Sequence, residues 1–221
     1  MKNSADIIKK EIGDRLNNLF SFYLKMDSSL IVNDKRVNLM KEKIKRVSID
    51  DDDTSFYFDF FNALSDYRER LKTAIANSDI DFLIGVESRI KNINSISSKI
   101  YQYINLKNEK GDVSINKCLN DLFGIRIIVP LYRMSTLMKI VEELAIENGW
   151  KCRIIDASKQ DYKAIHLYLI KDNFSLRWEV QFWLERFDAR NRESHAKYKQ
   201  SYTSWESSYS TKELYKVIKN G

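Results

Sequence analysis

The sequence predicts an α+β protein in which helices flank a mixed β-sheet and the N-terminal part is helical. Apolar residues recur every three or four positions up to about residue 115, and every second position from about residue 122. With 221 residues, 43% hydrophobic and 12% aromatic, the chain can form one substantial core. A single Pro, six Gly and the lack of a long apolar run exclude low-complexity and membrane-spanning classes.

The first part of the chain is expected to contain three helices. Helical spacing marks residues 7–24 and 60–75, and a third helix is expected over residues 80–104. A Gly-containing turn follows at residues 108–113. Four aspartates at 50–53 lack the alternating spacing of a metal loop, so we interpret them as a solvated loop and helix start.

The second part alternates between strands and helices. Turn and breaker residues divide it into a strand at 123–131 that stops at Pro130, a helix at 134–148 ended by Gly149, strands at 150–155, 164–171 and 176–184, and a last helix from 186 to about 200. The turn dipeptide Asp172-Asn173 joins the last two strands. These two strands should therefore form an antiparallel hairpin.

The strand at 176–184 carries polar side chains on one face and apolar side chains on the other. Its polar face includes Glu179 and Gln181, and the opposite face is expected to be core. A buried carboxylate needs a partner, and a divalent cation with bound phosphates is one. Asp121, which opens the apolar run of a second strand, would supply another carboxylate for such a site. The alternative is an edge strand with a solvated polar face.

The charge, the cysteines and the start of the chain indicate which kinds of partner and which cellular compartment to expect. A net charge of +6 and a pI of about 9.1 favour a polyanionic partner such as nucleotide phosphates or RNA. Cys118 and Cys152 lie in apolar sequence and are expected to be buried thiols rather than a disulfide or zinc site. The start of the chain has no apolar signal core, so we expect a cytoplasmic protein without membrane or DNA partners.

Four stretches in the second part resemble the synthetase domain of the RelA/SpoT alarmone enzymes in order and spacing. They are residues 87–99, Asp121-Leu-Phe-Gly-Ile-Arg, Tyr162-Lys-Ala-Ile-His, and Glu179-Val-Gln with residues 195–199 downstream. The resemblance implies a nucleotidyltransferase-like fold and transfer of pyrophosphate from ATP, with Mg²⁺, to a ribose 3′-hydroxyl. It divides the chain into a helical extension (1–79), a synthetase core (80–205) and a short tail (206–221).

The resemblance also assigns residues to the ATP donor. Arg89 and Arg126 would sandwich the adenine, a role that suits planar guanidinium groups. The phosphates would be held by residues expected on one helix, beside a glycine expected at a close backbone turn: Lys91, Ser95, Lys99 and Gly124. Without the resemblance, these basic residues would be interpreted as an exposed helix face.

For catalysis, the resemblance implies two carboxylates that hold Mg²⁺ and two neighbouring side chains. Asp121 and Glu179 would hold the metal, and Glu179 could also accept the proton of the attacking hydroxyl. His166 would contact phosphate near the attacking group, although a lone strand histidine is more often structural. Gln181 is the other side chain assigned to catalysis. Tyr162 would stack on the acceptor base, although taken alone it would pass as a core or turn aromatic.

Departures from the family pattern concern the acceptor. The loop before Tyr162 is short and has Asp161 in place of a glycine, Trp183 replaces a commonly basic residue, and Ser194 replaces an acidic one. The change in the loop alters the pocket for a guanine nucleotide, and the changes at Trp183 and Ser194 should weaken contacts to a free acceptor's own 5′ phosphates. A longer polyanion could instead be held by three lysines, namely Lys171, Lys9 and Lys10.

The expected activity is therefore that of the toxic small alarmone synthetases. Neither a hydrolase domain nor a two-helix tail is apparent in the sequence. Members of the toxic branch pyrophosphorylate the tRNA 3′ CCA end and are held by an antitoxin. The alternatives are a synthetase that acts on GDP or GTP, and a non-catalytic RNA-binding or antitoxin-binding module.

Overall fold

Five strands form one mixed sheet, which confirms the predicted α+β class. The structure is a computed structural model that describes residues 4–48, 54–78, 86–131, 133–194 and 196. The spatial order is β3-β4-β7-β6-β5; β4 and β7 run parallel, and the other neighbouring strands are antiparallel. The bounds are β3 Glu87–Ile90, β4 Phe123–Val129, β5 Cys152–Asp156, β6 Ile165–Leu169 and β7 Trp178–Leu184.

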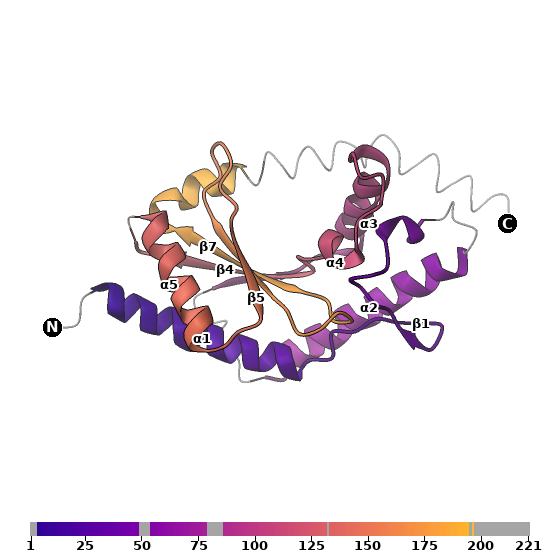
Figure 1. Ribbon diagram of the computed structural model, residues 1–221, viewed down its shortest axis with the longest axis horizontal. Coiled ribbons are helices and arrows are strands. Elements are labelled where there is room, and N and C mark those ends of the chain that lie inside the picture. Colours follow the sequence, from indigo (N-terminus) through magenta and orange to yellow (C-terminus); the bar gives the residue numbers. More distant parts are fainter. Residues whose placement is uncertain (1–3, 49–53, 79–85, 132, 195, 197–221) are drawn as a thin grey trace.

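Helices flank this sheet (Figure 1). The longer ones are α1 (Ser4–Lys25), α2 (Thr54–Ala76), α3 (Ile93–Tyr101) and α5 (Met134–Glu147). Several short elements were not predicted: β1 (Ile31–Val32), β2 (Lys35–Arg36), α4 (Ile115–Cys118), a π-helical turn at Gln102–Leu106, and 3-10 turns at Ile44–Arg46 and Glu185–Phe187. Within the described ranges, none of the helices has the length and apolar character needed to cross a membrane.

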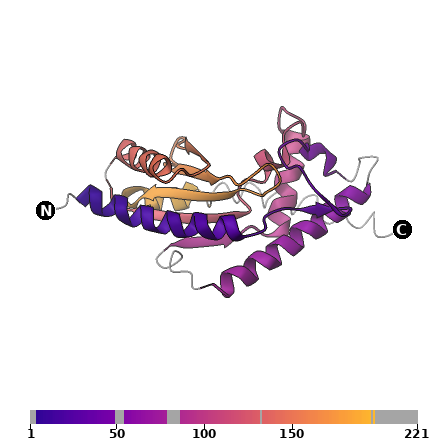
Figure 2. The same ribbon diagram turned by 60° about the horizontal axis from the view of Figure 1, so that its bottom comes forward.

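α1 forms because one stripe of its apolar residues is buried against the rest of the chain. The stripe follows helical spacing and consists of Ile12, Leu16, Leu19, Phe20 and Tyr23. Figure 2 shows α1 lying along the sheet, while α2 extends at an angle to it. Gly13 lets α5 approach closely, since a Cβ at this position would lie 3.0 Å from Leu144 Cδ2. α1 and α5 therefore belong to the same layer.

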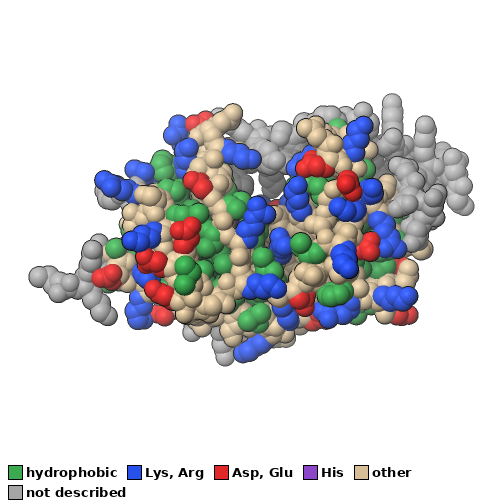
Figure 3. Space-filling view, viewed as in Figure 1, with side chains coloured by type: hydrophobic (Ala, Val, Ile, Leu, Met, Phe, Trp, Pro, Cys, Tyr) green, Lys and Arg blue, Asp and Glu red, His purple; other side chains and the backbone are tan. Residues whose placement is uncertain are grey.

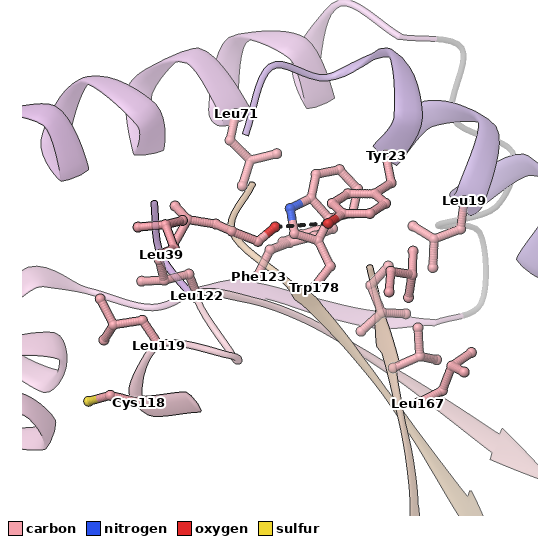
Figure 4. Packing of buried hydrophobic residues seen from close by; sticks show 14 of the residues in the cluster. Leu19, Tyr23, Leu39, Leu71, Cys118, Leu119, Leu122, Phe123, Leu167 and Trp178 are labelled. Atoms are coloured by element: carbon pink, nitrogen blue, oxygen red, sulfur yellow. Dashed lines mark hydrogen bonds between the residues drawn. The ribbon is translucent and has the colours of Figure 1, made fainter. Parts of the chain in front are cut away.

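The core face of β7 centres on Trp178 (Figure 4). Trp178 is fully buried, and its ring centroid lies 5.0 Å from that of Tyr23 and 4.7 Å from that of Phe123. Its indole N–H donates to the Tyr67 hydroxyl at 2.7 Å, which satisfies a polar group that water cannot reach. Because Tyr23 lies in α1 and Tyr67 in α2, the N-terminal helices and the sheet share one hydrophobic core.

β7 is the central strand of the sheet, so the alternative of a solvated edge strand is wrong. All of its residues are buried, on both faces. The predicted antiparallel pairing of β6 with β7 is confirmed. The Asp172 side chain accepts from the Phe174 N–H in the turn between them. The predicted strand and helix at 123–131 and 134–148 also form, within two residues of their predicted ends.

The predicted helix at 80–104 is wrong in its first half. Residues 87–90 form the edge strand β3, and α3 begins at Ile93. Asn92 sets this boundary because its side chain accepts from the Ser95 N–H and caps the helix. Residues 79–85 and the aspartates at 50–53 lie outside the described residues.

The predicted last helix is confirmed over its first part. A 3-10 turn at Glu185–Phe187 leads into a helix at residues 188–194. Residue 195 and residues 197–221, which include most of the downstream stretch that resembles the family, lie outside the described part of the chain. The described segment contributes Arg190, Asn191 and Arg192 to the surroundings of the site.

Candidate active site

Neighbouring strands bring most of the predicted site residues onto one face of the sheet. Glu179 of β7 pairs in register with Gly124 of β4 and Tyr168 of β6. Two residues further along β7, Gln181 pairs with Arg126 and His166, and β3 places Arg89 beside Gly124. Paired residues on adjacent strands lie side by side on the same face. Apart from Asp121, which precedes β4, the predicted catalytic and adenine-binding residues therefore occupy two adjacent rows.

Asp121, just before β4, lies between two lysines. Its Oδ2 accepts from Lys91 Nζ at 2.6 Å, and its Oδ1 accepts from Lys99 Nζ at 2.9 Å. The three side chains are between 15% and 18% exposed. Asn120 Oδ1 lies 3.3 Å from Lys99 Nζ as a further acceptor. Two cations around one anion leave a positive charge, which suits the binding of a polyphosphate.

Burial and charge shift the pKa values within this lysine–aspartate cluster. Burial alone would raise the pKa of Asp121, but Lys99 and Lys91 hold that pKa well below its ordinary value. Burial lowers the pKa of Lys91, against the opposing effect of Asp121, and the charge of Lys99 lowers it further. At Lys99 the attraction of Asp121 outweighs burial and raises the pKa. Asp121 is therefore ionised at neutral pH, and a bound anion would further stabilise the charged form of Lys91.

The backbone around Lys91 is held from two sides. Its N–H donates to the Leu122 carbonyl at 2.8 Å, which continues the β3–β4 pairing. Its carbonyl accepts from Arg68 Nε of α2 at 2.9 Å. Immediately after Lys91, Asn92 caps α3, and Ser95 lies in the first turn of this helix. The N-terminal end of the helix dipole therefore adds to the positive field of the lysine–aspartate cluster.

Glu179 is 5% exposed and is held by hydrogen bonds on both oxygens. His166 Nδ1 lies 3.0 Å from its Oε1, and Gln181 Nε2 donates to its Oε2 at 2.7 Å. The Tyr168 hydroxyl, which also hydrogen-bonds to Glu179, lies 3.2 Å from His166 Nδ1. Because an ionised carboxylate accepts but cannot donate, Nδ1 of His166 carries a proton. Nε2 can then accept from the Tyr162 hydroxyl at 2.8 Å.

The pKa of Glu179 lies below its ordinary value although the side chain is buried. Burial would raise the pKa, but the hydrogen bond from His166 outweighs it, and the hydrogen bond from Gln181 adds to this effect. The charge of Asp121 acts in the opposite direction, so the two carboxylates lie within electrostatic reach of each other. Burial and the Glu179 charge together raise the pKa of Tyr168. Glu179 is thus an ionised carboxylate in a fixed orientation at neutral pH.

The two carboxylates could serve a hard cation if a ligand supplied further oxygens. No group of three or more His, Cys, Asp or Glu side chains suited to a metal occurs in the described part of the chain. Mg²⁺ is commonly bound by one or two carboxylates together with substrate phosphates and water. Asp121 and Glu179, both ionised and electrostatically coupled, fit that pattern.

Arg126 links the two rows to the edge of the sheet. Its guanidinium donates to Glu87 at 2.7 Å and to Gln181 at 3.4 Å, and it lies 3.6 Å from the ring centroid of Trp183. A cavity of about 100 Å³ is lined by Arg89 and Arg126, and Gly124 also contributes to its lining. The pair that the resemblance assigns to adenine therefore borders one cavity.

Gly124 differs from its predicted role as a turn. It is the second residue of extended β4, and its φ angle is outside the left-handed region. A Cβ at this position would lie 4.0 Å from Glu179 Oε2. The missing side chain therefore leaves open the space beside the carboxylate.

Tyr162 lies at the end of a loop that is tied to the last helix. Trp183 Nε1 donates to its hydroxyl at 3.2 Å. Asn191, which is fully buried, accepts from the Lys163 N–H and donates to the Lys163 carbonyl, each at 2.8 Å. Asp161, at the position where the family has glycine, pairs with Arg190 at 2.8 Å. An ion pair before Tyr162 and two hydrogen bonds after it therefore hold this loop against the last helix.

The three lysines predicted to contact a long polyanion lie away from these rows. Lys171 donates to the Leu24 and Met26 carbonyls at the end of α1, at 2.7 and 3.2 Å. Lys9 pairs with two acidic residues of α5, and Lys10 pairs with Asp14 one turn later. The structure does not bring these lysines to the candidate active site. Among the thiols, Cys118 is buried and Cys152 half-buried, and both are free.

Sequence reasoning missed several residues that shape the site. They are Glu87, Arg68, Tyr168, Asn191 and Arg192, and the last of these forms an ion pair with Glu87. Tyr168 could have been found, because it follows His166 with the strand spacing of two. The others act through tertiary contacts between distant segments, and no local pattern marks them.

A comparison with known protein families matches residues 88–203 to the region found in RelA / SpoT proteins. The matched region covers more than half of the chain and contains the rows of site residues. This chain belongs to the RelA/SpoT family. A search of curated proteins gave no match. RelA/SpoT proteins are pyrophosphotransferases, so the chain is a transferase of the pyrophosphokinase, (p)ppGpp-synthetase type.

Proposed function

We propose that this RelA/SpoT-family chain transfers pyrophosphate from ATP to the 3′-hydroxyl of the tRNA CCA end, as the toxin of a toxin–antitoxin pair. The observation that carries the choice of acceptor is the complete burial of Trp183, where related synthetases commonly have a basic residue. With Arg126 over its ring and its N–H bonded to Tyr162, this side chain offers no charge to the 5′ phosphates of a free nucleotide. Other basic groups would then have to hold the acceptor.

The charge distribution supports a polyanionic acceptor. The chain has a net charge of +6. Figure 3 shows Lys and Arg side chains along the middle of the drawn face, where the sheet meets the α3 side of the molecule. Basic residues in such a band attract nucleic-acid phosphates over a distance of about a Debye length, roughly 8 Å at physiological salt.

On the donor side, the lysine–aspartate cluster would bind the ATP phosphates. Lys91 and Lys99 carry the positive charge, and Ser95 offers a hydroxyl in the first turn of α3. In the absence of nucleotide, both lysines are engaged by Asp121. Phosphate oxygens would take over these charge-assisted hydrogen bonds and release the carboxylate. The adenine would enter the cavity that Arg89 and Arg126 border.

We propose Asp121 and Glu179 as the residues that hold Mg²⁺. Both are ionised, and their charges interact. When bound, Mg²⁺ would neutralise the charge of the transferring phosphates and orient them. Gly124 leaves room for ligand oxygens beside Glu179, since no side chain covers that space.

Glu179 would accept the proton of the attacking 3′-hydroxyl as the hydroxyl oxygen bonds to the β-phosphorus of ATP. The bond between the β-phosphorus and the oxygen of the α-phosphate breaks, and AMP leaves. Glu179 is ionised at neutral pH and is fixed by His166 and Gln181. As the proton arrives, the hydrogen bond from His166 Nδ1 keeps the carboxylate oriented toward the acceptor. Positioning of this kind lets a weak base act without reorganisation. Tyr162, at the other ring nitrogen of His166, would stack on the terminal adenine of the acceptor.

Transfer of label identifies the acceptor. The chain is incubated with β-labelled ATP and, in parallel, with tRNA, GDP or GTP. We expect labelled tRNA that can no longer be aminoacylated, and activity on tRNA that falls steeply with added salt. Efficient labelling of GDP or GTP with unlabelled tRNA would overturn the tRNA proposal in favour of an alarmone synthetase. Lack of transfer to any acceptor would favour the non-catalytic binding module.

A further inference from the structure

We propose that Trp183 is a positioning residue that couples the ATP site to the acceptor site. It holds Arg126 on the face of its indole ring and orients Tyr162 through its indole N–H. This inference rests on the proposed function, since Arg126 and Tyr162 are taken there as the donor and acceptor stacking residues. Trp183 is fully buried and would touch neither substrate itself.

The donor side of the coupling is a cation–π contact. The Arg126 guanidinium carbon lies 3.6 Å from the Trp183 ring centroid. Because this contact uses one guanidinium face, it fixes the plane in which Arg126 can meet a base. Hydrogen bonds to Glu87 and Gln181 restrict the same plane from its edges. Loss of the indole ring should therefore release Arg126 and weaken ATP binding.

The acceptor side of the coupling is a hydrogen bond. Trp183 Nε1 lies 3.2 Å from the Tyr162 hydroxyl, and the two rings meet edge to face at 84° with centroids 5.9 Å apart. The indole N–H can only donate, so it uses the hydroxyl oxygen and leaves the Tyr162 proton for His166 Nε2. The direction of the Tyr162 ring is thus set by a residue that also supports Arg126.

β7 supplies a matched control in Trp178. Both tryptophans are fully buried on the same strand, and each donates its N–H to a tyrosine hydroxyl. Trp178 points to the core and bonds to Tyr67, whereas Trp183 points to the site. A merely structural role for Trp183 predicts that equivalent substitutions at the two positions have equivalent effects.

The test uses Trp183→Phe, which keeps a ring under Arg126 but removes the N–H, and Trp183→Leu, which removes both. ATP affinity is measured by direct binding of a non-hydrolysable ATP analogue without acceptor. The acceptor KM is measured with whichever of tRNA, GDP or GTP the wild-type chain labels. We expect Trp183→Phe to raise the acceptor KM about two- to tenfold with analogue affinity unchanged. Trp183→Leu should also weaken analogue binding, by about two- to thirtyfold.

Two comparisons separate coupling from loss of fold. Trp178→Phe should lower the melting temperature but leave both affinities unchanged. Trp183→Phe combined with Tyr162→Phe should behave like Tyr162→Phe alone, because the N–H no longer has an acceptor to orient. The inference is overturned by additive effects in this double variant, by identical patterns at positions 183 and 178, or by unchanged analogue affinity in Trp183→Leu. Failure to label tRNA overturns the proposed acceptor alone, since analogue binding needs no acceptor.

Discussion

The two faces of β7 are equally buried but satisfy their polar groups in different ways. On the core face, the only polar side-chain group in this strand is the indole N–H of Trp178, and it is satisfied by a hydrogen bond to Tyr67. The remaining side chains on this face are aliphatic or aromatic. On the site face, Glu179 and Gln181 lie in a network of titratable and amide groups. Burial therefore does not distinguish core from site in this strand. The two faces differ because the site face keeps an ionised carboxylate, held in one orientation by hydrogen bonds, whereas the core face carries no charge.

Such a fixed charge opposes stability in the absence of substrate. A buried carboxylate must be compensated by its neighbours, and Glu179 is compensated by His166 and Gln181 on one strand pair. Asp121 is compensated by Lys91 and Lys99 from a different segment. We therefore expect substitutions on the site face to affect turnover more than stability, and substitutions on the core face to do the reverse.

The largest difference between loss of activity and loss of stability is expected for Glu179→Gln and Phe182→Leu, two substitutions on opposite faces of β7. Glu179→Gln should lower transfer by about a thousandfold or more, because the proposed base and metal ligand lose their charge. Its free energy of unfolding should change by less than about 1 kcal/mol, since loss of a buried charge offsets loss of a hydrogen bond. Phe182→Leu should cost about 1.5 kcal/mol and leave kcat unchanged.

These two variants are measured by initial transfer rates and by urea unfolding. Val180→Ala, on the core face beside Phe182, serves as a control for a smaller loss of packing. Substantial transfer by Glu179→Gln would contradict the assignment of Glu179. A drop in kcat for Phe182→Leu under conditions where the variant is fully folded would contradict the expectation that the core face affects stability and not activity.

Asp121→Asn should abolish transfer and also change how stability depends on pH. The folded-state pKa of Asp121 lies below its ordinary value of 3.8, so its stabilising effect is complete above that value and is lost as the pH falls below it. In the variant, Lys91 and Lys99 lose their partner, which should cost about 2 kcal/mol at pH 6. The cost should shrink as the pH falls below the ordinary pKa, because the wild-type chain then loses the same interaction.

Urea unfolding of both chains at pH 6 and pH 3 checks this prediction. Lys117→Gln, which removes an exposed ion pair with Glu109, is a control that should change stability little at either pH. A constant difference between wild type and Asp121→Asn at the two pH values would exclude Asp121 as the titrating partner of the lysines.

Tyr162→Ala should reduce acceptor use about five- to 150-fold, because stacking of a base on an aromatic ring contributes about 1 to 3 kcal/mol. ATP-analogue binding should remain intact, since Tyr162 is not among the residues that border the donor cavity. The acceptor KM and direct analogue binding are the two measurements. Tyr57→Ala, which removes a half-buried tyrosine of α2, controls for general loss of aromatic packing. Equal losses in both substrates would make Tyr162 a structural residue.

Much of the sheet could be predicted from the sequence because most of its strands are rich in apolar residues and are bounded by turn or breaker residues. Glu179 and Gln181 were recognised as unusual by the alternation of side chains along β7, and His166 by its motif. β3 was missed because its four residues were predicted as part of the helix at 80–104, and they become a strand only through pairing with β4. Strand formation at a sheet edge depends on a partner that lies far away in sequence.

The geometry of the site could be predicted less well than its composition. The sequence identified Lys91, Lys99 and Asp121 individually, but their mutual hydrogen bonds depend on how α3 follows β3. The same limit applies to Arg68 and Asn191, which hold the backbones of two site segments from other elements. Contacts of this kind follow from packing and carry no local periodicity.

The smallest expected effect concerns Arg126, which lies in the second row and pairs with the edge strand β3. Arg126→Ala should weaken binding of an ATP analogue about two- to thirtyfold, because a stacked guanidinium contributes up to about 2 kcal/mol. Acceptor binding without nucleotide should remain unchanged. The substitution also leaves Glu87 with Arg192 as its remaining cationic partner among the described contacts, so the edge of the sheet keeps one ion pair.

Calorimetric titration of each substrate alone tests this expectation. Arg192→Ala removes the other ion pair of Glu87 while leaving the cavity lining intact, and is the matched control. If Arg126 acts on ATP, Arg126→Ala alone should weaken analogue binding. If Arg126 instead secures β3 to the sheet, both variants should weaken both substrates and lower the melting temperature together. That second result would move Arg126 from the proposed site to the scaffold, and Trp183 would then act on Tyr162 alone.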